Sequence, residues 1–265
     1  MTAVSQTYVG RSRQPRHPPV AGVALAWLLA AATVGTQIAY PLVEGTTLQR
    51  VTIATVVLFF ITCVTHALVH RGPLFAAGLV VVAAGGGLAA EAIGVRTGYP
   101  FGSYSYAGTL GPEVLDVPVV VPLAWTMMTY PVLLAARRVG RRFAPVVGGL
   151  GLMAWDMFLD PQMVGDGHWT WAHPYPSLTA IEGIPLTNFA GWAAVGTAMM
   201  LVLDRLLPRS AADELVPAAL LGWTWLGYIL GNVLWFGEIS VAVTAGIALG
   251  LLVVPYTWLL WQSRA

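Results

Sequence analysis

Two aspartates lie one helical turn apart in the apolar segment Trp155-Asp156-Met157-Phe158-Leu159-Asp160-Pro161. A carboxyl group is costly to place in an apolar segment, and in membrane proteins such a group marks a functional site by default. The proline removes a backbone donor and breaks the hydrogen-bond ladder of a helix, so we expect it to help end this one. The segment therefore predicts a site embedded in a membrane, with the rest of the chain as its scaffold.

The composition agrees with a membrane protein. The chain has 265 residues, of which 57% are hydrophobic and only 9% charged, whereas a soluble domain is about 25% charged. The net charge of +1 argues against a nucleic-acid partner, which would need a basic face. The single cysteine, Cys63, excludes an intramolecular disulfide and a cysteine metal cluster.

Eight apolar runs are long enough to span a bilayer, which takes roughly 20 residues. We therefore predict an all-α, polytopic transmembrane bundle over residues 20–265, preceded by a polar N-terminal tail, 1–19. The first run is too long for the apolar core of a signal peptide, so we expect it to be retained as a helix. The predicted spans are about 20–40, 50–69, 73–94, 117–137, 145–163, 186–207, 214–236 and 239–262.

The arginines test this count, since all 13 basic residues are arginine. With eight spans, both termini share one side, and that side carries 11 arginines against 2, Arg50 and Arg96, on the other. Basic residues concentrate in cytoplasmic loops. We therefore predict a protein of the plasma membrane with both termini in the cytoplasm.

Two long loops, about 95–116 and 164–185, fall on the opposite side and are rich in Gly, Pro, Tyr and Trp. Non-helical backbone near a membrane is tolerated where it packs on protein or lines a cavity, so we expect both loops to cap the bundle. An ordinary interfacial belt of aromatic residues is the alternative.

The two loops also carry a weak internal repeat. Tyr104, Pro118 and Trp125 are spaced 14 and then 7 residues apart, and Trp171, Pro185 and Trp192 repeat that spacing. This pattern favours two repeated units of two helices each in parallel arrangement. The third and fourth spans form one unit, and the fifth and sixth spans form the other.

Several polar side chains are expected to converge in the outer half of the bundle, beneath these loops. They are Glu91, Asp156, Asp160, Asn188, Asn232 and Glu238. A buried carboxylic acid can stay protonated near neutral pH, and environment can give two nearby carboxyls opposite roles. The structural alternative is that the carboxyls only accept hydrogen bonds that tie the loops to the helices.

A metal site is not expected. His168 and His173 share a loop with Asp166, but their spacing matches no zinc motif. No cofactor is predicted.

The segments Thr97-Gly-Tyr-Pro-Phe-Gly-Ser-Tyr104-Ser-Tyr106 and Leu110-Gly-Pro112 resemble the carotenoid biosynthesis membrane protein family. Trp155-Asp156 with Asp160-Pro161, and the stretch from Gly183 to Trp192, resemble it as well. The likeness covers about residues 75–195. Described members are the CruF-type carotenoid 1,2-hydratases, so the resemblance implies a cofactor-independent hydro-lyase that adds water across the terminal C1–C2 double bond of an acyclic (ψ) end group. It implies monocyclic or fifty-carbon acyclic carotenoids as substrates.

The roles of individual residues come from the pattern of carboxyls and aromatics. We predict Asp156 as the acid that protonates the alkene, with Asp160, Asn188 or Glu91 holding the attacking water. Aromatic faces stabilise a carbocation by cation–π contact. The predicted substrate-binding residues are Tyr104, Tyr106, Trp125, Trp155, Trp169, Trp171, Asn188 and Trp192.

Two other functions remain open at this stage. An intramembrane prenyltransferase could use the two aspartates to bind magnesium diphosphate, but it usually needs a second acidic motif and basic residues. Carboxylates embedded in a membrane also serve proton-coupled transport. A non-enzymatic carrier of carotenoid or lipid, or a scaffold for other carotenoid-pathway enzymes, is therefore the second alternative. The expected partners are a carotenoid from the bilayer, membrane lipid and other enzymes of the pathway.

Overall fold

The computed structural model describes residues 18–264, and in that range eight helices are long and apolar enough to cross a membrane. The predicted bundle is therefore confirmed. The predicted polar tail, with Arg11, Arg13 and Arg16, lies almost entirely outside the described residues. The helices are α1 (Val20–Ala39), α2 (Gly45–Arg71), α3 (Pro73–Thr97), α4 (Val120–Val139), α5 (Ala144–Gly165), α6 (Leu186–Leu206), α7 (Leu215–Gly231) and α8 (Ile239–Gln262).

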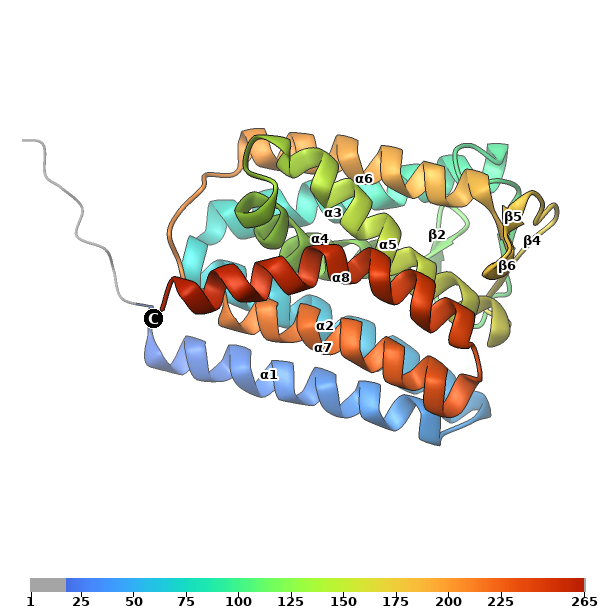
Figure 1. The fold of residues 1–265 in the computed structure, drawn as a ribbon, viewed down its shortest axis with the longest axis horizontal. Helices are drawn as coiled ribbons and strands as arrows, with labels where there is room; N and C mark the ends of the chain where they lie inside the picture. The colour runs from blue at the N-terminus through green and yellow to red at the C-terminus, as the bar shows by residue number, and fades with distance from the viewer. Residues whose placement is uncertain (1–17, 265) are drawn as a thin grey trace, which may run out of the picture.

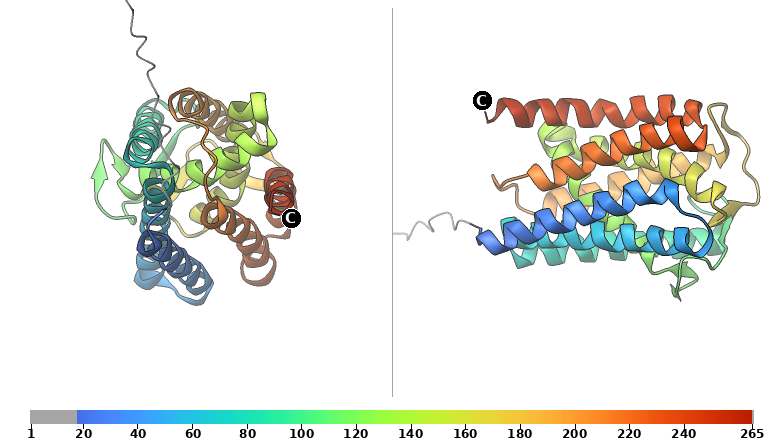
Figure 2. Two further views of the ribbon diagram at one scale, coloured as in Figure 1. Left: turned by 90° about the vertical axis from the view of Figure 1, so that its left-hand side faces the viewer. Right: turned by 90° about the horizontal axis from the view of Figure 1, so that it is seen from below.

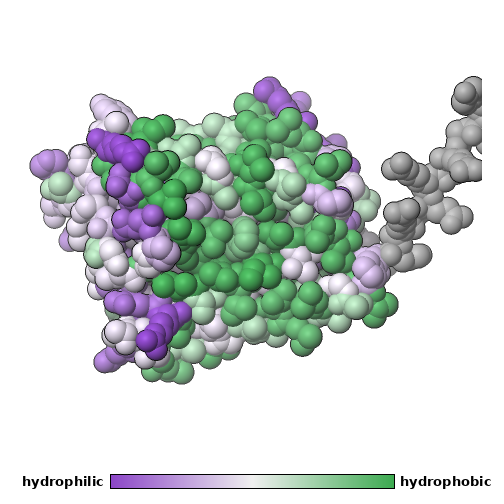
Figure 3. All heavy atoms as spheres, turned by 180° about the vertical axis from the view of Figure 1, so that it is seen from behind, coloured by the Kyte–Doolittle hydropathy of each residue, from purple (hydrophilic) through white to green (hydrophobic). Residues whose placement is uncertain are grey.

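Three short helical turns adjoin these helices: η1 (Tyr40–Leu42) follows α1, η2 (Arg141–Phe143) precedes α5, and the π-helical turn η3 (Asn232–Phe236) extends α7. The helices run side by side along the long axis, and α1 begins at the same end of the bundle at which α8 ends (Figure 1). On the face shown in Figure 3, a broad apolar band covers the middle of the molecule, with hydrophilic residues towards its ends. The shape and the band match a protein that spans a membrane.

The helix α5 continues past Pro161 to Gly165, so the prediction that this proline helps end the helix is wrong. A proline removes only one N–H from the ladder. The chain accommodates that loss and adds one more turn, which carries Met163 to a buried position.

The two long loops form short strands at the end of the bundle opposite the termini (Figure 2). The strand β1 (Tyr104–Tyr106) pairs antiparallel with β4 (Trp169–Trp171), which joins the two loops. The strands β2 (Glu113–Val114) and β3 (Val117–Pro118) form one hairpin, and β5 (Ser177–Leu178) and β6 (Ile181–Pro185) form another. The loops therefore close one end of the bundle as a single linked cap.

The internal repeat is visible in the order of these elements. A helix, a strand, a hairpin and a second helix follow one another from α3 to α4, and the same order recurs from α5 to α6. We call these the first unit and the second unit. Tyr104 and Trp171 are directly opposite each other in the β1–β4 pair, and Trp125 stacks on Trp192 with ring centroids 3.8 Å apart. Contacts between corresponding residues are what two units related by a two-fold axis make close to that axis.

The end opposite the cap is held by buried ion pairs. The Arg71 guanidinium, on α2, lies 3.1 Å from Glu214 at the start of α7, and Arg138 of α4 lies 2.6 Å from the same carboxylate. The Tyr256 hydroxyl of α8 donates to Glu214 as well. One carboxylate therefore links four helices at this end, away from the cap.

Candidate active site

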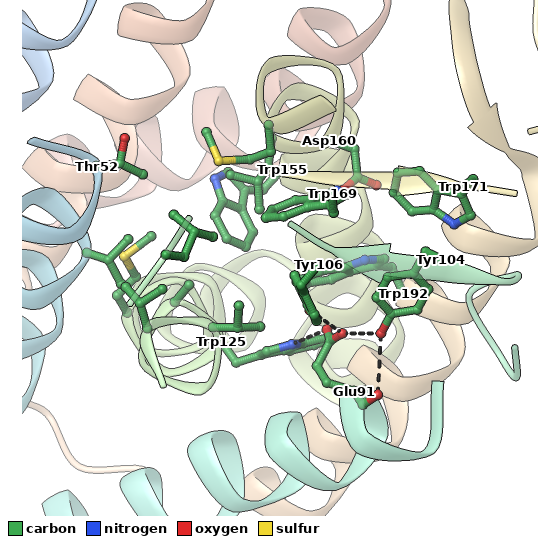
Figure 4. Close-up of a pocket in the computed structure, with 18 residues that line it drawn as sticks. Thr52, Glu91, Tyr104, Tyr106, Trp125, Trp155, Asp160, Trp169, Trp171 and Trp192 are labelled. Carbon is green, nitrogen blue, oxygen red and sulfur yellow. Dashed lines mark hydrogen bonds between the residues drawn. The ribbon is translucent and has the colours of Figure 1, made fainter. Parts of the chain in front are cut away.

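Glu91 lies in the last two turns of α3 and is 5% exposed. The Tyr104 hydroxyl donates a short hydrogen bond to its carboxyl group, and the Tyr106 hydroxyl donates to the same oxygen at 2.9 Å. The Trp125 indole N–H donates to the other oxygen at 3.0 Å (Figure 4). Three donors therefore hold this side chain in one orientation, out of about four acceptor positions that a carboxylate offers.

The two phenols stay protonated in this setting. Burial, reinforced by the neighbouring Glu91 carboxyl, raises the pKa of Tyr104 and of Tyr106 well above the ordinary value for tyrosine. Both hydroxyl groups therefore stay available as hydrogen-bond donors to Glu91 at physiological pH.

The other two carboxyls, Asp156 and Asp160, lie one turn apart on α5 and are 0% and 3% exposed. The Asn188 side-chain amide, from the first turn of α6, donates to Asp156 Oδ2 at 2.7 Å and to Asp160 Oδ2 in a shorter bond. The Trp169 indole N–H of β4 donates to Asp160 Oδ1 at 3.1 Å. Asp156 Oδ1 has no hydrogen-bond partner within residues 18–264.

A cavity of about 70 Å³ lies beneath the cap, and carboxyls from both units face it. Glu91 comes from the first unit and Asp160 from the second (Figure 4). On this measure about 10–15 Å³ holds one water molecule, so the cavity has room for the end of a chain or for several waters. Asp156 and Asn188 do not line it, although the Asn188 amide joins Asp156 to Asp160. The other predicted residues that line it are Tyr104, Tyr106, Trp125, Trp155, Trp169, Trp171 and Trp192.

Aromatic rings form much of the wall of this cavity. Trp125 and Trp192 stack almost parallel, with 7° between their planes, and Trp155 meets Trp192 edge-on at 5.7 Å. Tyr106 and Trp169 also meet edge-on, at 5.8 Å. Ring faces and edges carry opposite partial charges, so this wall can solvate a cation without offering it a nucleophile.

Comparison with known proteins identifies the family of the chain. The family described as Carotenoid biosynthesis protein matches residues 51–255, which include both units and the whole cavity. The chain belongs to this family. This match confirms the resemblance that the sequence motifs indicate.

One curated member of similar sequence is the bisanhydrobacterioruberin hydratase of Haloarcula japonica. It is 30% identical to this chain over 181 residues, which is 66% of this chain and 59% of the relative. The match thus spans less than two thirds of the relative's length. No solved structure matches the chain.

Two polar residues that were expected at the site do not reach it. Glu238 is exposed, and the Asn232 side chain donates to the Tyr228 carbonyl one turn earlier in α7. Both belong to the turn between α7 and α8, which lies beside the two units and outside them. No group of three His, Cys, Asp or Glu side chains is placed to hold a metal ion anywhere in residues 18–264.

Sequence reasoning missed the apolar part of the wall. Thr52 and Val56 of α2, Met127 of α4, and Leu159 and Met163 of α5 also line the cavity. Nothing in the sequence distinguishes these side chains from those that face lipid.

Gly87 of α3 leaves space beside the cavity wall, because a Cβ there would lie 2.6 Å from the Trp125 indole. It therefore makes room for the indole that binds Glu91 one turn later.

Proposed function

We propose that this protein is a carotenoid hydratase that adds water across the terminal C1–C2 double bond of an acyclic (ψ) end group. The observation that carries the proposal is the pair of carboxyls, Glu91 and Asp160, that face one aromatic cavity from opposite units. Membership of the carotenoid biosynthesis family and the likeness to a hydratase support it. The substrate is a carotenoid taken from the bilayer.

The second unit supplies the proton. Asp156 and Asp160 share one amide donor in a buried site, and two negative charges so close repel strongly. In the proposal the pair therefore holds one proton between its two carboxyls. Asp160 delivers the proton to C2, because it is the member that faces the cavity. Asp156, the acid expected from the sequence, does not line the cavity, and in the proposal it shares the proton with Asp160.

Protonation at C2 leaves a tertiary cation at C1, enclosed by the indole and phenol rings of the wall. Each desolvated cation–π contact contributes about 1–2 kcal/mol. The remaining charge is balanced by the first unit. The three donors on Glu91 match a carboxylate, which only accepts hydrogen bonds. In the proposal Glu91 is ionised.

Water then completes the addition. A water molecule beside Glu91 attacks C1, its oxygen forms the new C–O bond, and its surplus proton passes to Glu91. The proton on Glu91 then returns through water in the cavity to Asp160, which lines the same space, so the aspartate pair and Glu91 regain their starting states. The product is a tertiary alcohol. The reaction needs neither metal nor redox cofactor.

Pigment analysis tests this function. The protein would be produced in a host that makes lycopene or γ-carotene, and the extracted pigments separated and weighed by mass spectrometry. The expected result is a gain of one water mass for each hydrated ψ end. An unchanged pigment set, with the protein verified in the membrane fraction, would refute hydration of these substrates and favour a carrier or scaffold.

The orientation in the membrane is part of the same proposal. We propose that both termini face the cytoplasm and that the cap faces the other side, in the plasma membrane. Within the described residues, the arginines gather at the end that carries the termini, where Arg71, Arg137, Arg138, Arg141, Arg142, Arg205, Arg209 and Arg264 lie at helix ends and turns. A reporter that fluoresces only in the cytoplasm should be bright when fused after Ala265. A dark fusion at full expression would reverse the orientation.

A further inference from the structure

A second and larger hollow lies between α1, α2, α5 and α7, and the proposed reaction does not use it. Its volume is about 370 Å³, several times that of the cavity beneath the cap. We call it the lateral groove. Most of its lining is apolar, and its aromatic members are Tyr40, Phe59, Trp155, Trp223, Tyr228, Trp235 and Phe236.

The lateral groove adjoins the cavity that holds Glu91 and Asp160. Six side chains line both spaces, so only these side chains stand between them. They are Thr52, Val56, Met127, Trp155, Leu159 and Met163. A linear molecule that lies in the groove therefore points one end past Trp155 toward the two carboxyls.

The groove opens on the apolar side of the molecule. One side of its mouth is formed by the end of α1 with η1, where Ile38 is 51% and Leu42 66% exposed. The other side is formed by the end of α7 with η3, where Leu230 is 41% and Trp235 52% exposed. The helices α1 and α7 run next to each other along the lower side of the bundle (Figure 1). A mouth lined by exposed apolar side chains in a membrane-spanning region faces lipid rather than water.

The groove is unlike a simple packing defect. Among residues 18–264, the buried oxygens Gln37 Oε1, Thr55 Oγ1 and Thr224 Oγ1 lack a hydrogen-bond partner, and all three residues line the groove. Empty cavities in proteins are apolar, whereas buried polar atoms are almost always paired with protein or water. These oxygens give the wall of the groove three positions at which water can bind beside an apolar occupant.

We propose that the lateral groove binds the long apolar chain of the substrate, which enters sideways from the bilayer between α1 and α7. The occupant is a linear isoprenoid whose terminal double bond lies in the cavity while its chain remains in the groove. This inference rests on the proposed function for the reaction but predicts binding independently of it. It also implies that the protein binds and hydrates one end of the molecule at a time, because the rest of a long chain must extend through the mouth of the groove into lipid.

Gly227 of α7 offers a way to obstruct the groove. It lines the groove, and a Cβ added there meets nothing nearer than Trp223 Nε1 at 3.7 Å. Gly222 lies on the same helix, does not line the groove, and would meet nothing within 4 Å. Gly227→Phe therefore fills the groove, and Gly222→Phe is the matched control.

The test measures binding and turnover separately. Wild type and both variants would be placed in phosphatidylcholine nanodiscs, and lycopene binding followed by quenching of tryptophan fluorescence. Hydration would be followed for lycopene and for a short monoterpene alkene with the same isopropylidene end. Gly227→Phe should weaken lycopene binding and hydration by roughly tenfold or more. It should leave hydration of the short alkene unchanged, and Gly222→Phe should match wild type in all assays.

Thr55→Leu is a second variant, which narrows the groove from the α2 side in case Gly227→Phe folds poorly. It should weaken lycopene binding in the same direction. If either folded variant binds lycopene as tightly as wild type, the groove does not hold the substrate chain. The same conclusion follows if the variants bind lycopene normally but retain less phospholipid on purification than wild type. If wild type binds lycopene in a manner sensitive to Gly227→Phe but hydrates neither alkene, the groove assignment stands and the proposed reaction fails.

Discussion

The first and second units share one scaffold but hold their carboxyls in opposite ways. In the first unit, Glu91 receives three hydrogen bonds, from two phenols of β1 and one indole of α4. In the second unit, Asp160 accepts a hydrogen bond from the Trp169 indole of β4. It also accepts one from the Asn188 amide of α6, which donates to Asp156 as well. Donors surround the first carboxyl, whereas a second carboxyl stands beside the other. The difference teaches that a repeated fold can supply one group suited to negative charge and one suited to holding a proton.

The largest effect should come from the proton donor. Asp160→Asn keeps the size of the side chain and can still accept from Trp169, but it has no acidic proton for C2. Loss of a general acid typically lowers the rate by about 10²–10⁴-fold, and we expect hydration to fall within that range. The rate would be measured as hydrated carotenoid formed per unit of membrane-inserted protein.

Asp156→Asn is the matched control for that variant. It removes a carboxyl from the same helix face but not the one that lines the cavity. The expected loss is roughly tenfold, because Asp160 can still carry and deliver a proton but no longer has a neighbouring carboxylate that favours its protonated form. A larger loss in Asp156→Asn than in Asp160→Asn would restore Asp156 as the acid and contradict the assignment made here.

Removal of the charge in the first unit should have the next largest effect. Glu91→Gln turns one oxygen into an NH₂ group, which would face a tyrosine or tryptophan donor. Removing one preorganised electrostatic group commonly costs about 10²-fold in rate, and an unpaired buried donor costs about 1–3 kcal/mol of stability. Both the hydration rate and the melting temperature should therefore fall. Glu113→Gln, at an exposed position in the same unit, should change neither.

The stacked pair of Trp125 and Trp192, which come from different units, is expected to show a smaller difference. Trp125→Phe and Trp192→Phe each weaken one aromatic stack, which is worth about 0.5–1.5 kcal/mol. Only Trp125 also donates to Glu91. Thermal unfolding should therefore show a larger decrease for Trp125→Phe, and hydration should fall mainly in that variant. Equal effects on both measurements would mean that the two units use their tryptophans alike.

The smallest effect is expected at an exposed contact of the first unit. Arg96 lies 2.8 Å from Asp116, and their side chains are 50% and 65% exposed. Exposed ion pairs contribute about 0–1 kcal/mol, so Arg96→Ala should leave the melting temperature and the pigment profile nearly unchanged. A clear loss of function there would show that the exposed edge of the cap matters to the site.

The helices could be predicted because length and apolar composition are enough to define a span, and each observed helix lies within a few residues of its predicted range. Glu91 and Asp160 stood out because charge is rare in such segments.

The strands could not be foreseen, since each of β1 and β4 has three residues and its partner lies in a different loop. The distinct positions of Asp156 and Asp160 depend on the rotation of α5 about its axis, which its neighbours set. The walls of the cavity and groove are made of side chains that also suit lipid, so the sequence carries no signal for them.

The contact of equivalent residues across the two units has a consequence for how such a protein can change over time. Two identical units that meet through equivalent residues would each carry the same acidic residue at the same position. Once both copies reside in one chain, a substitution in one copy is no longer repeated in the other. Glu91 and Asp160 show this freedom, because the 67-residue offset of the repeat places Phe158 at the position of Glu91 and Ile93 at the position of Asp160. Each copy therefore carries its carboxyl at a position of its own, on an architecture that both copies preserve.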